Sequence, residues 1–380
     1  MEPLPVLAPL GRYEDLAASL LVGHRTAAPA ALAVIHRLHP RHRDAATPWK
    51  VVPAEPSEVA TAPFDLGDAR LVVARGHDSR DWDALASHVR AVHGRDGAVR
   101  RFELAVEAVV DGDLAALATA LAADPGLIAA RSSRVTGSDP PAHRATLLHY
   151  LAANGVEGHR QRCPANAVDV ARLLLSAGAS PDALAVTYGG EFTTLTLLVS
   201  SSPPFAAKVQ VPLVHALIDA GAAVDGCGTG RWRSPLRTAI VFGFVDAARA
   251  LAARGAAVND VVLATGLGDI PAFEAMLPSS TAEQRHAALA VASQLGHAAI
   301  VARLLAAGED ADRFNPDGCH GHGTPLHHAA LHGHLEVVRL LVAGGARVDR
   351  RDRIWNGTAV GWAEHGGHAD VAAFLRAQVT

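Results

Sequence analysis

Small and apolar residues recur at helical spacing along much of the chain, and the pattern is clearest over residues 323–346. Leu326 and Ala329 fall on one face of a short helix, and their modest size lets another helix approach closely. Thr324 can cap this helix through its hydroxyl, and Pro325 follows where a missing N–H costs nothing. The pattern therefore predicts a short helix that packs tightly against a neighbour.

A second short helix is predicted directly after the first. Gly333 interrupts the pattern, and Val337, Val338 and Leu341 then form a new apolar stripe. Gly345 lacks a Cβ atom and suits the left-handed conformation that ends many helices. Two helices this short cannot bury their apolar faces alone, so similar helix pairs are expected on either side.

The same pattern returns at a fixed interval. Thr358 follows Thr324 by 34 residues and opens another helix, glycine turn and helix. A period in the thirties together with the T-P-L-H-x-A-A motif of residues 324–330 is typical of ankyrin repeats, so this region resembles the ankyrin-repeat family. The resemblance implies an all-α solenoid of helix-turn-helix units with short β-hairpin fingers between them.

Degenerate copies precede these two. Aligned on the threonine and glycine positions, they predict about eight units of roughly 35 residues over residues 99–380. We therefore predict two domains, a helical leader at residues 1–98 and the repeat array at residues 99–380. The copies open near Glu103, Thr146, Thr193, Ser234, Val261, Ala287, Thr324 and Thr358.

The leader contains no recognisable repeat. Helical spacing predicts helices over residues 15–21, 30–38, 68–75 and 81–89. Asp81 is a plausible cap for the last helix, and the proline-rich segment 41–64 is predicted to be a loop. The leader resembles the helical segment that precedes ankyrin repeats in uncharacterised bacterial proteins, a family without a settled activity, so it implies architecture only.

Two copies carry insertions. The Thr146 copy has 11 extra residues around segment 156–164, and the Thr193 copy has 7 around segment 200–205. Both insertions fall between the two helices of a unit. Because the two units are adjacent, the insertions should emerge side by side on one edge of the array.

Composition argues against several classes of partner. A net charge of -4 gives no electrostatic footprint for nucleic acid or an anionic membrane, and we expect neither. The three cysteines, Cys163, Cys227 and Cys319, are distant and odd in number, which argues against a disulfide framework. No signal peptide and no run of roughly eighteen apolar residues is evident. We expect a soluble, cytoplasmic protein and take a monomer as the working hypothesis.

Histidines cluster near the C-terminus in a way that suggests metal binding. His328 and His332 are four residues apart on a predicted helix, so their imidazoles point the same way. However, the ankyrin resemblance implies internal hydrogen bonding for His327 and His334, and no carboxylate or Cys-x-x-Cys pair completes a ligand set. We therefore expect no metal, cofactor or catalytic residue. A metal-dependent hydrolase, or an enzyme that uses the leader, is the alternative.

The ankyrin resemblance implies a concave groove lined by finger tips and by the outer faces of the first helices. Exposed aromatic residues in such a groove are typical anchors for a partner protein. Trp362 is the main candidate anchor, although it could instead cover the core of the last repeat. By position, the groove residues are His328, Leu331, His332, Trp355, Trp362 and His365.

The insertion edge is a second candidate surface. It contains Glu157 and Arg160, with Tyr188 in the following finger. Polar and aromatic loops on a rigid scaffold often carry function, although these loops could also be tolerated surface variation. The sequence thus predicts a non-catalytic protein–protein interaction scaffold, and the identity of its partner cannot be read from the fold.

Overall fold

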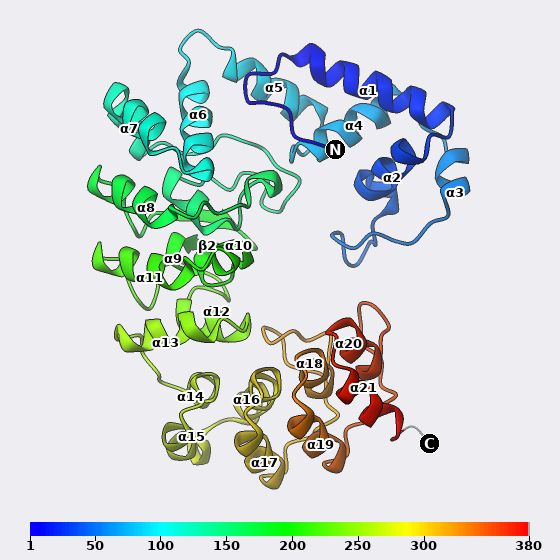
Figure 1. Ribbon diagram of the computed structural model, residues 1–380, viewed down its shortest axis with the longest axis vertical. Coiled ribbons are helices and arrows are strands. Elements are labelled where there is room, and N and C mark those ends of the chain that lie inside the picture. Colours follow the sequence, from blue (N-terminus) through cyan, green and yellow to red (C-terminus); the bar gives the residue numbers. More distant parts are fainter. Residues whose placement is uncertain (379–380) are drawn as a thin grey trace. The chain divides into compact units, whose positions relative to one another are not determined.

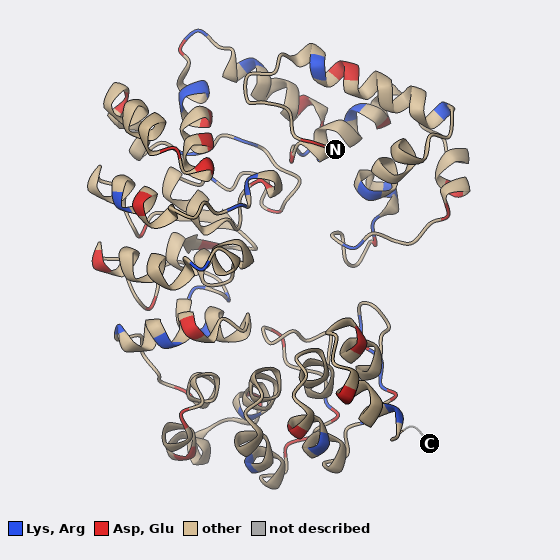
Figure 2. Cartoon of the chain, in the orientation of Figure 1, with Lys and Arg blue, Asp and Glu red and all other residues tan. Residues whose placement is uncertain are grey.

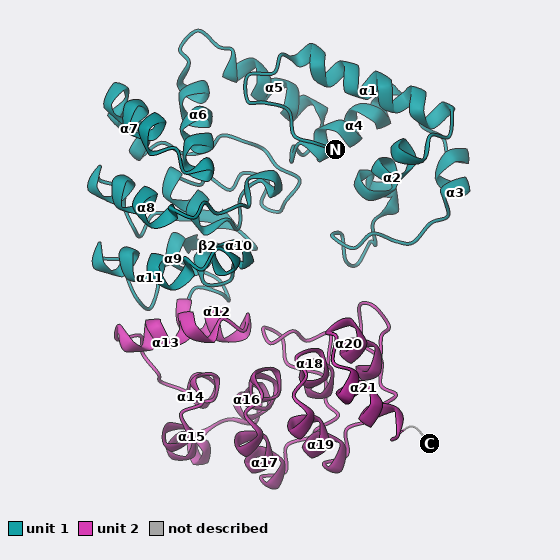
Figure 3. Cartoon of the chain, viewed as in Figure 1, with its two compact units in different colours: residues 1–233 teal, residues 234–380 magenta. Residues whose placement is uncertain are grey.

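The computed structural model describes residues 1–378, and these are mostly helical, as the sequence predicts (Figure 1). The chain forms two compact units, Met1–Arg233 and Ser234–Thr380 (Figure 3). The leader belongs to the same compact unit as the first helix pairs. A boundary at residue 98, where the first of these pairs begins, stays a prediction.

The leader consists of α1 (Leu10–Arg25), α2 (Pro29–Leu38), the short 3-10 turn η1 (Pro40–His42), α3 (Pro56–Thr61), α4 (Leu66–Gly76) and α5 (Trp82–Val92). Its core includes Ile35 and Val72, both almost fully buried. Asp81 caps α5, because its carboxylate accepts a hydrogen bond from the N–H of Ala84. The predicted loop at 41–64 is wrong in one respect, since α3 lies inside it and begins at a proline in its first turn.

Among residues 1–378, no single helix has the length and apolar composition needed to cross a membrane. The pair α1 and α2 meets both criteria when taken together, with a bend of 113° between the two helices.

The first helix pairs stack in unit 1. They are α6 (Ala98–Asp111) with α7 (Leu114–Ala123), η3 (Leu147–Ala152) with α8 (Ala167–Ser176), and α9 (Thr194–Leu198) with α11 (Gln210–Asp219). The short helices η2 (Pro125–Ile128), η4 (Gly158–Arg160) and α10 (Ser202–Ala206) lie in the connections. The segment after Thr146 is a 3-10 helix, which ends where Ala153 adopts a left-handed conformation.

One β-hairpin finger is fully formed in unit 1. Strands β1 (Leu184–Thr187) and β2 (Gly190–Thr193) pair antiparallel, with Thr187 opposite Gly190. The two turn residues, Tyr188 and Gly189, both have positive φ, which matches the twist of the two strands in a tight hairpin. The predicted finger at this position is therefore confirmed.

Unit 2 consists of α12 (Pro235–Val241), α13 (Val245–Ala253), α14 (Val261–Leu267), α15 (Ile270–Met276), η5 (Leu277–Ser279), α16 (Ala282–Leu295), α17 (Ala298–Ala306), α18 (Pro325–Leu331), α19 (Leu335–Ala343), α20 (Ala359–His365) and α21 (Ala369–Arg376). The first helices α14, α16, α18 and α20 each contact the next one. Helix α16 starts earlier than the predicted Ala287, because Thr281 and Gln284 form a capping box.

Candidate functional site

The six groove residues predicted from the sequence lie together in unit 2. They line one cavity of about 720 Å³. Helix α18 and its C-cap supply His328, Leu331 and His332, helix α20 supplies Trp362 and His365, and the preceding finger supplies Trp355. The cavity is completed by Phe242, Gln294, His320, His322, Gly357 and Gly361.

The repeat period explains why these side chains meet. His328 and Trp362 are 34 residues apart, and so are Leu331 and His365. Because α18 and α20 begin in the same register and pack against each other, equivalent positions project side by side. The shared cavity therefore follows from the spacing of the repeats.

Trp362 forms a wall of this cavity and is not an exposed anchor. Only 9% of it is exposed, and its indole N–H donates to the carboxylate of Asp352 at 3.1 Å. Asp352 also accepts backbone N–H groups, including that of Gly357 at 2.7 Å. Burial raises the pKa of Asp352, but these hydrogen bonds outweigh burial and bring the pKa below its usual value. The carboxylate is therefore charged. The expectation of an exposed Trp362 is wrong, because the finger holds a carboxylate that fixes the indole.

Trp355 is the accessible aromatic side chain of the cavity, with 53% exposed. Its ring packs edge-to-face against His322, at 5.1 Å between ring centroids, and against Trp362 at 6.0 Å. A large aromatic group that is half exposed beside buried aromatic walls is suited to contact a partner. The sequence prediction for Trp355 therefore has a structural basis.

His328 lies at the base of the cavity and has unused hydrogen-bonding capacity. It is 4% exposed, and within the described residues neither ring nitrogen has a hydrogen-bond partner. Its ring stacks on His320 at 5.2 Å. Burial, followed by the charges of His320 and His322, lowers its pKa well below the usual value, so the imidazole is neutral. A neutral imidazole offers one donor and one acceptor, and leaving such groups unpaired costs about 1–3 kcal/mol.

The neighbouring histidines His327 and His334 hold the repeats together. The Thr324 hydroxyl lies 2.8 Å from Nδ1 of His327, whose Nε2–H donates to the carbonyl of Gly357 at 3.2 Å. His334 donates through Nε2–H to the carbonyl of Gln294 at 2.9 Å. The internal role predicted for both residues is confirmed. Within residues 1–378, no three His, Cys, Asp or Glu side chains are grouped so that they could hold a metal ion.

The predicted insertion edge has a different structure from the one expected. Glu157 is 1% exposed and Arg160 is fully buried. The Nη2 atom of Arg160 lies 2.7 Å from Glu103 and 2.8 Å from Glu107, both on α6. The expectation that Glu157 and Arg160 form an exposed surface is wrong, because the insertion folds inward to neutralise carboxylates on α6.

These residues form a buried network of ion pairs. Most of the network could not be predicted from any one segment of the sequence, because its members come from distant segments. Arg134 lies 3.0 Å from Glu103 and 3.4 Å from Glu157, and His143 lies 3.2 Å from Glu157. The one local signal is on α6, where Glu103, Glu107 and Asp111 recur every fourth residue and form an acidic face (Figure 2). When such a face is buried, its negative charges need arginines from elsewhere in the chain to balance them.

The network lowers the pKa values of Glu103 and His88, with opposite effects on their charge. Burial raises the pKa of Glu103, but Arg134 and Arg160 outweigh this and lower it to about 2. Burial and then Arg134 lower the pKa of the nearby His88 to about 4. Glu103 is therefore charged and His88 neutral near pH 7.

We predict that His88 makes the stability of unit 1 depend on pH. Its pKa is lower in the folded state than the usual 6.5, so the unfolded chain binds more protons between pH 6.5 and about 4. The free energy of unfolding should fall by about 3 kcal/mol as the pH drops through this range. Urea denaturation at a series of pH values measures this fall. The variant His88→Gln should show a shallower pH dependence, and an unchanged slope would contradict the assignment to His88.

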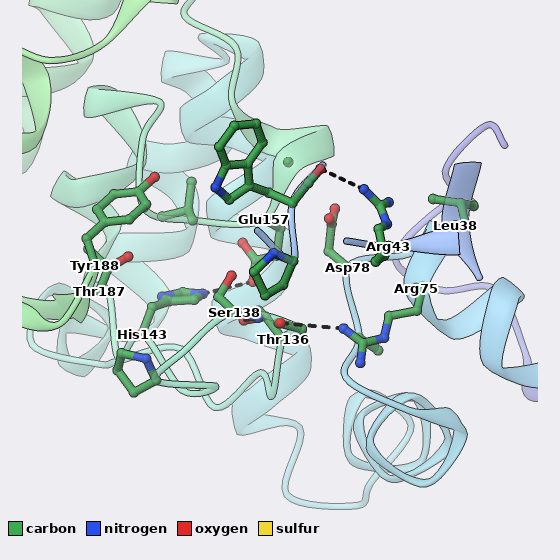
Figure 4. A pocket seen from close by; sticks show the side chains of 18 of the residues that line it. Leu38, Arg43, Arg75, Asp78, Thr136, Ser138, His143, Glu157, Thr187 and Tyr188 are labelled. Carbon is green, nitrogen blue, oxygen red and sulfur yellow. Dashed lines mark hydrogen bonds and ion pairs between the residues drawn. The ribbon is translucent and has the colours of Figure 1, made fainter. Parts of the chain in front are cut away.

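Tyr188, predicted to lie in the finger between the two insertions, is 57% exposed at the hairpin tip, and its hydroxyl donates to Asn154 at 2.7 Å. Tyr188 and Glu157 line a second cavity, of about 820 Å³, within unit 1 (Figure 4). Asn154, two residues before the first insertion segment, donates to the hydroxyl of Ser200 at the start of the second, at 2.8 Å.

Comparisons with known proteins agree with this repeat architecture. The family model for three copies of the ankyrin repeat matches residues 261–352 and 289–378, and the model for a single ankyrin repeat matches residues 143–185. Stacked helix-turn-helix units with a hairpin finger define the class, a repeat solenoid. The chain therefore contains ankyrin repeats, at residues 143–185 and 261–378.

Curated relatives match short parts of the chain. Human cyclin-dependent kinase 4 inhibitor B is 46% identical over 52 residues, which are 14% of this chain and 37% of the relative. Human cyclin-dependent kinase inhibitor 2A is 47% identical over 53 residues, 14% of this chain and 33% of the relative. Bovine cyclin-dependent kinase 4 inhibitor B is 37% identical over 83 residues, 22% of this chain and 60% of the relative. The chain thus spans about a third of the length of the two human relatives.

Among solved structures, the ankyrin repeat domain of human ASB11 is similar at 23% identity. The match covers 61% of this chain and 97% of that domain, with a TM-score of 0.31.

Proposed function

We propose that this protein is a non-catalytic interaction scaffold that binds a partner protein through the unit 2 groove. The observation that carries the proposal is the cavity in which half-exposed Trp355 lies beside buried Trp362 and the unpartnered imidazole of His328. Aromatic groups in partly desolvated pockets supply much of the binding energy at protein interfaces. Ankyrin repeats are interaction scaffolds in general, and the names of the curated relatives describe kinase inhibitors, which supports a protein partner here.

The walls of the groove are held in place before any partner arrives. Trp362 is fixed by Asp352, and His327 ties the start of α18 to the last finger. A surface that needs little ordering loses less entropy on binding. The partner is expected to insert an apolar or aromatic side chain against Trp355.

Other properties belong to the same proposal. We infer a cytoplasmic location, which Cys163, Cys227 and Cys319 support, since none of the three forms a disulfide within residues 1–378. The net charge of -4 supports a partner that is neither nucleic acid nor an anionic membrane. A monomer is the simplest form of the scaffold.

We predict that Trp355→Ala weakens partner binding by at least tenfold, because truncating an aromatic interface anchor costs about 2 kcal/mol or more. Trp355 is half exposed, so its loss should leave the fold intact. Partners are captured from native lysate with wild-type protein and identified by mass spectrometry, and their affinities for the variants are then measured by calorimetry.

The matched control is Phe205→Ala, which removes a similarly exposed aromatic side chain, 56% exposed, from the insertion in unit 1. The proposal requires that this variant bind like wild type. Loss of the partner with Phe205→Ala but not with Trp355→Ala would move the site to the insertion edge and overturn the proposal.

A further inference from the structure

The 820 Å³ cavity of unit 1 is built by segments that are distant in the sequence (Figure 4). The leader contributes Arg43 and Arg75, the loop after η2 contributes Thr136 and Ser138, and the insertion contributes Glu157, with other residues around them. Its volume falls in the range of small-molecule sites, about 300–1,000 Å³. The cavity is separate from the groove, so an inference drawn from it does not depend on the proposed function.

Each carboxylate that lines this cavity already has at least one partner of its own. Glu157 accepts from His143 at 3.2 Å and lies 3.4 Å from Arg134. Asp78 lies 2.6 Å from Nδ1 of His159. Asp44 accepts two backbone N–H groups of its own loop, at 2.9 and 2.8 Å. Glu157 and Asp78 thus lie against Arg or His side chains, whereas Asp44 is held by its own loop and keeps its negative charge.

The two arginines of the cavity are not neutralised in this way. Arg43 donates to the carbonyl oxygens of Trp49, at 2.8 Å, and Arg37, while Arg75 donates to the carbonyl of Gly137 at 3.4 Å. Among residues 1–378, neither guanidinium forms an ion pair, and Nε of Arg75 is buried without a partner. Each guanidinium has more N–H donors than these bonds use.

The two positive charges also act on each other. Burial is the main cause that lowers the pKa of Arg75; the negative charge of Asp81 raises it, and the positive charges of Arg43 and Arg80 lower it. Placing two like charges near one cavity is unfavourable unless an anion binds between them. The unused N–H donors of Arg43 and Arg75 therefore favour a ligand with anionic oxygens over a cationic one.

We propose that this cavity binds a small phosphate monoester, with its phosphate group held by Arg43 and Arg75. Arginine binds phosphate oxygens through paired N–H donors. A phosphate monoester carries a charge of about -1.5 to -2 at pH 7, which nearly balances the charge of two guanidinium groups. Ser138 is exposed at the same cavity and can donate its hydroxyl to a phosphate oxygen.

The rest of the ligand would lie along aromatic side chains. Trp49 and Tyr188 line the cavity and are 60% and 57% exposed. Both rings are broad and apolar, so they suit a planar or ring-shaped organic group attached to the phosphate. Because the arginines belong to the leader and Tyr188 to the repeat array, a bound ligand would also join these two parts of unit 1.

The test uses the full-length protein and two commercially pure probes, adenosine 5′-monophosphate and adenosine, in phosphate-free buffer. Calorimetry should show binding of the monophosphate, competition by inorganic phosphate, and at least tenfold weaker binding of adenosine. Arg43→Gln and Arg75→Gln should each weaken monophosphate binding by at least tenfold. Arg90→Gln, which changes an exposed arginine of α5 outside the cavity, should leave it unchanged.

Circular dichroism shows which variants are folded. If Arg75→Gln fails to fold, the affinity of Arg43→Gln for the monophosphate is compared with that of wild type instead. The proposal is overturned if wild-type protein binds neither the monophosphate nor inorganic phosphate at millimolar concentration. It is equally overturned if folded arginine variants bind like wild type, or if adenosine binds as tightly as the monophosphate.

Discussion

Replacing Arg160 by alanine should destabilise unit 1 by roughly 3–5 kcal/mol, because it leaves buried carboxylates without their partner. Arg160 is fully buried, and its guanidinium lies 2.7 Å from Glu103, which is also fully buried. Glu107 lies 2.8 Å from the same guanidinium. Removing one partner of a buried ion pair costs more than the pair itself contributes, since the remaining charge stays in a poorly solvated site. Urea denaturation of the purified protein measures the loss.

The control for this prediction is Arg162→Ala, two residues further along the same insertion. Its side chain is 44% exposed and it forms ion pairs with Glu107 and Asp111, also on α6. Exposed ion pairs contribute about 1 kcal/mol or less, so this variant should be close to wild type. Equal effects of the two substitutions would show that burial of the Arg160 network does not stabilise unit 1.

The second large effect is expected from Trp362→Ala, which should destabilise unit 2 by roughly 3–5 kcal/mol. The substitution removes a nearly buried indole and the N–H that donates to Asp352 at 3.1 Å. It also exposes the ring of His328, whose centroid lies 5.3 Å from that of Trp362. Thermal and urea denaturation should both show the loss.

Trp355→Ala is the matched control, because it removes the same kind of side chain from the same cavity. Trp355 is 53% exposed, so its truncation should cost less than about 1 kcal/mol of folding stability. A Trp362→Ala variant as stable as wild type would contradict the interpretation that Trp362 covers the core of the last repeat. The comparison also explains why Trp355, and not Trp362, is suited to binding experiments.

The repeat architecture was readable from the sequence because its signals are local. Thr324 with His327 forms the cap, Gly345 has φ of 96°, and both features lie within a single unit. The 34-residue interval then places His328 beside Trp362 without any knowledge of the rest of the chain. The composition of the groove follows from these local signals.

The insertion could not be predicted in the same way, because its structure depends on distant residues. Glu157 and Arg160 are charged residues in a loop, which normally indicates exposure. Their burial follows from Glu103 on α6 and from Arg134, which lie far away in the sequence. Likewise, no local pattern connects Arg43 with Arg75, although both line one cavity.

Site-specific photo-crosslinking tests the central claim, that partners bind the unit 2 groove, most directly. A photoreactive phenylalanine analogue is placed at position 332, where His332 is exposed and lines the cavity, and at position 336, where Glu336 is exposed on α19 outside it. The groove account predicts that a captured partner crosslinks from position 332 and that Trp355→Ala abolishes this crosslink, while position 336 gives little product. A partner that crosslinks equally from both positions, or that still crosslinks from position 332 after Trp355→Ala, would contradict it.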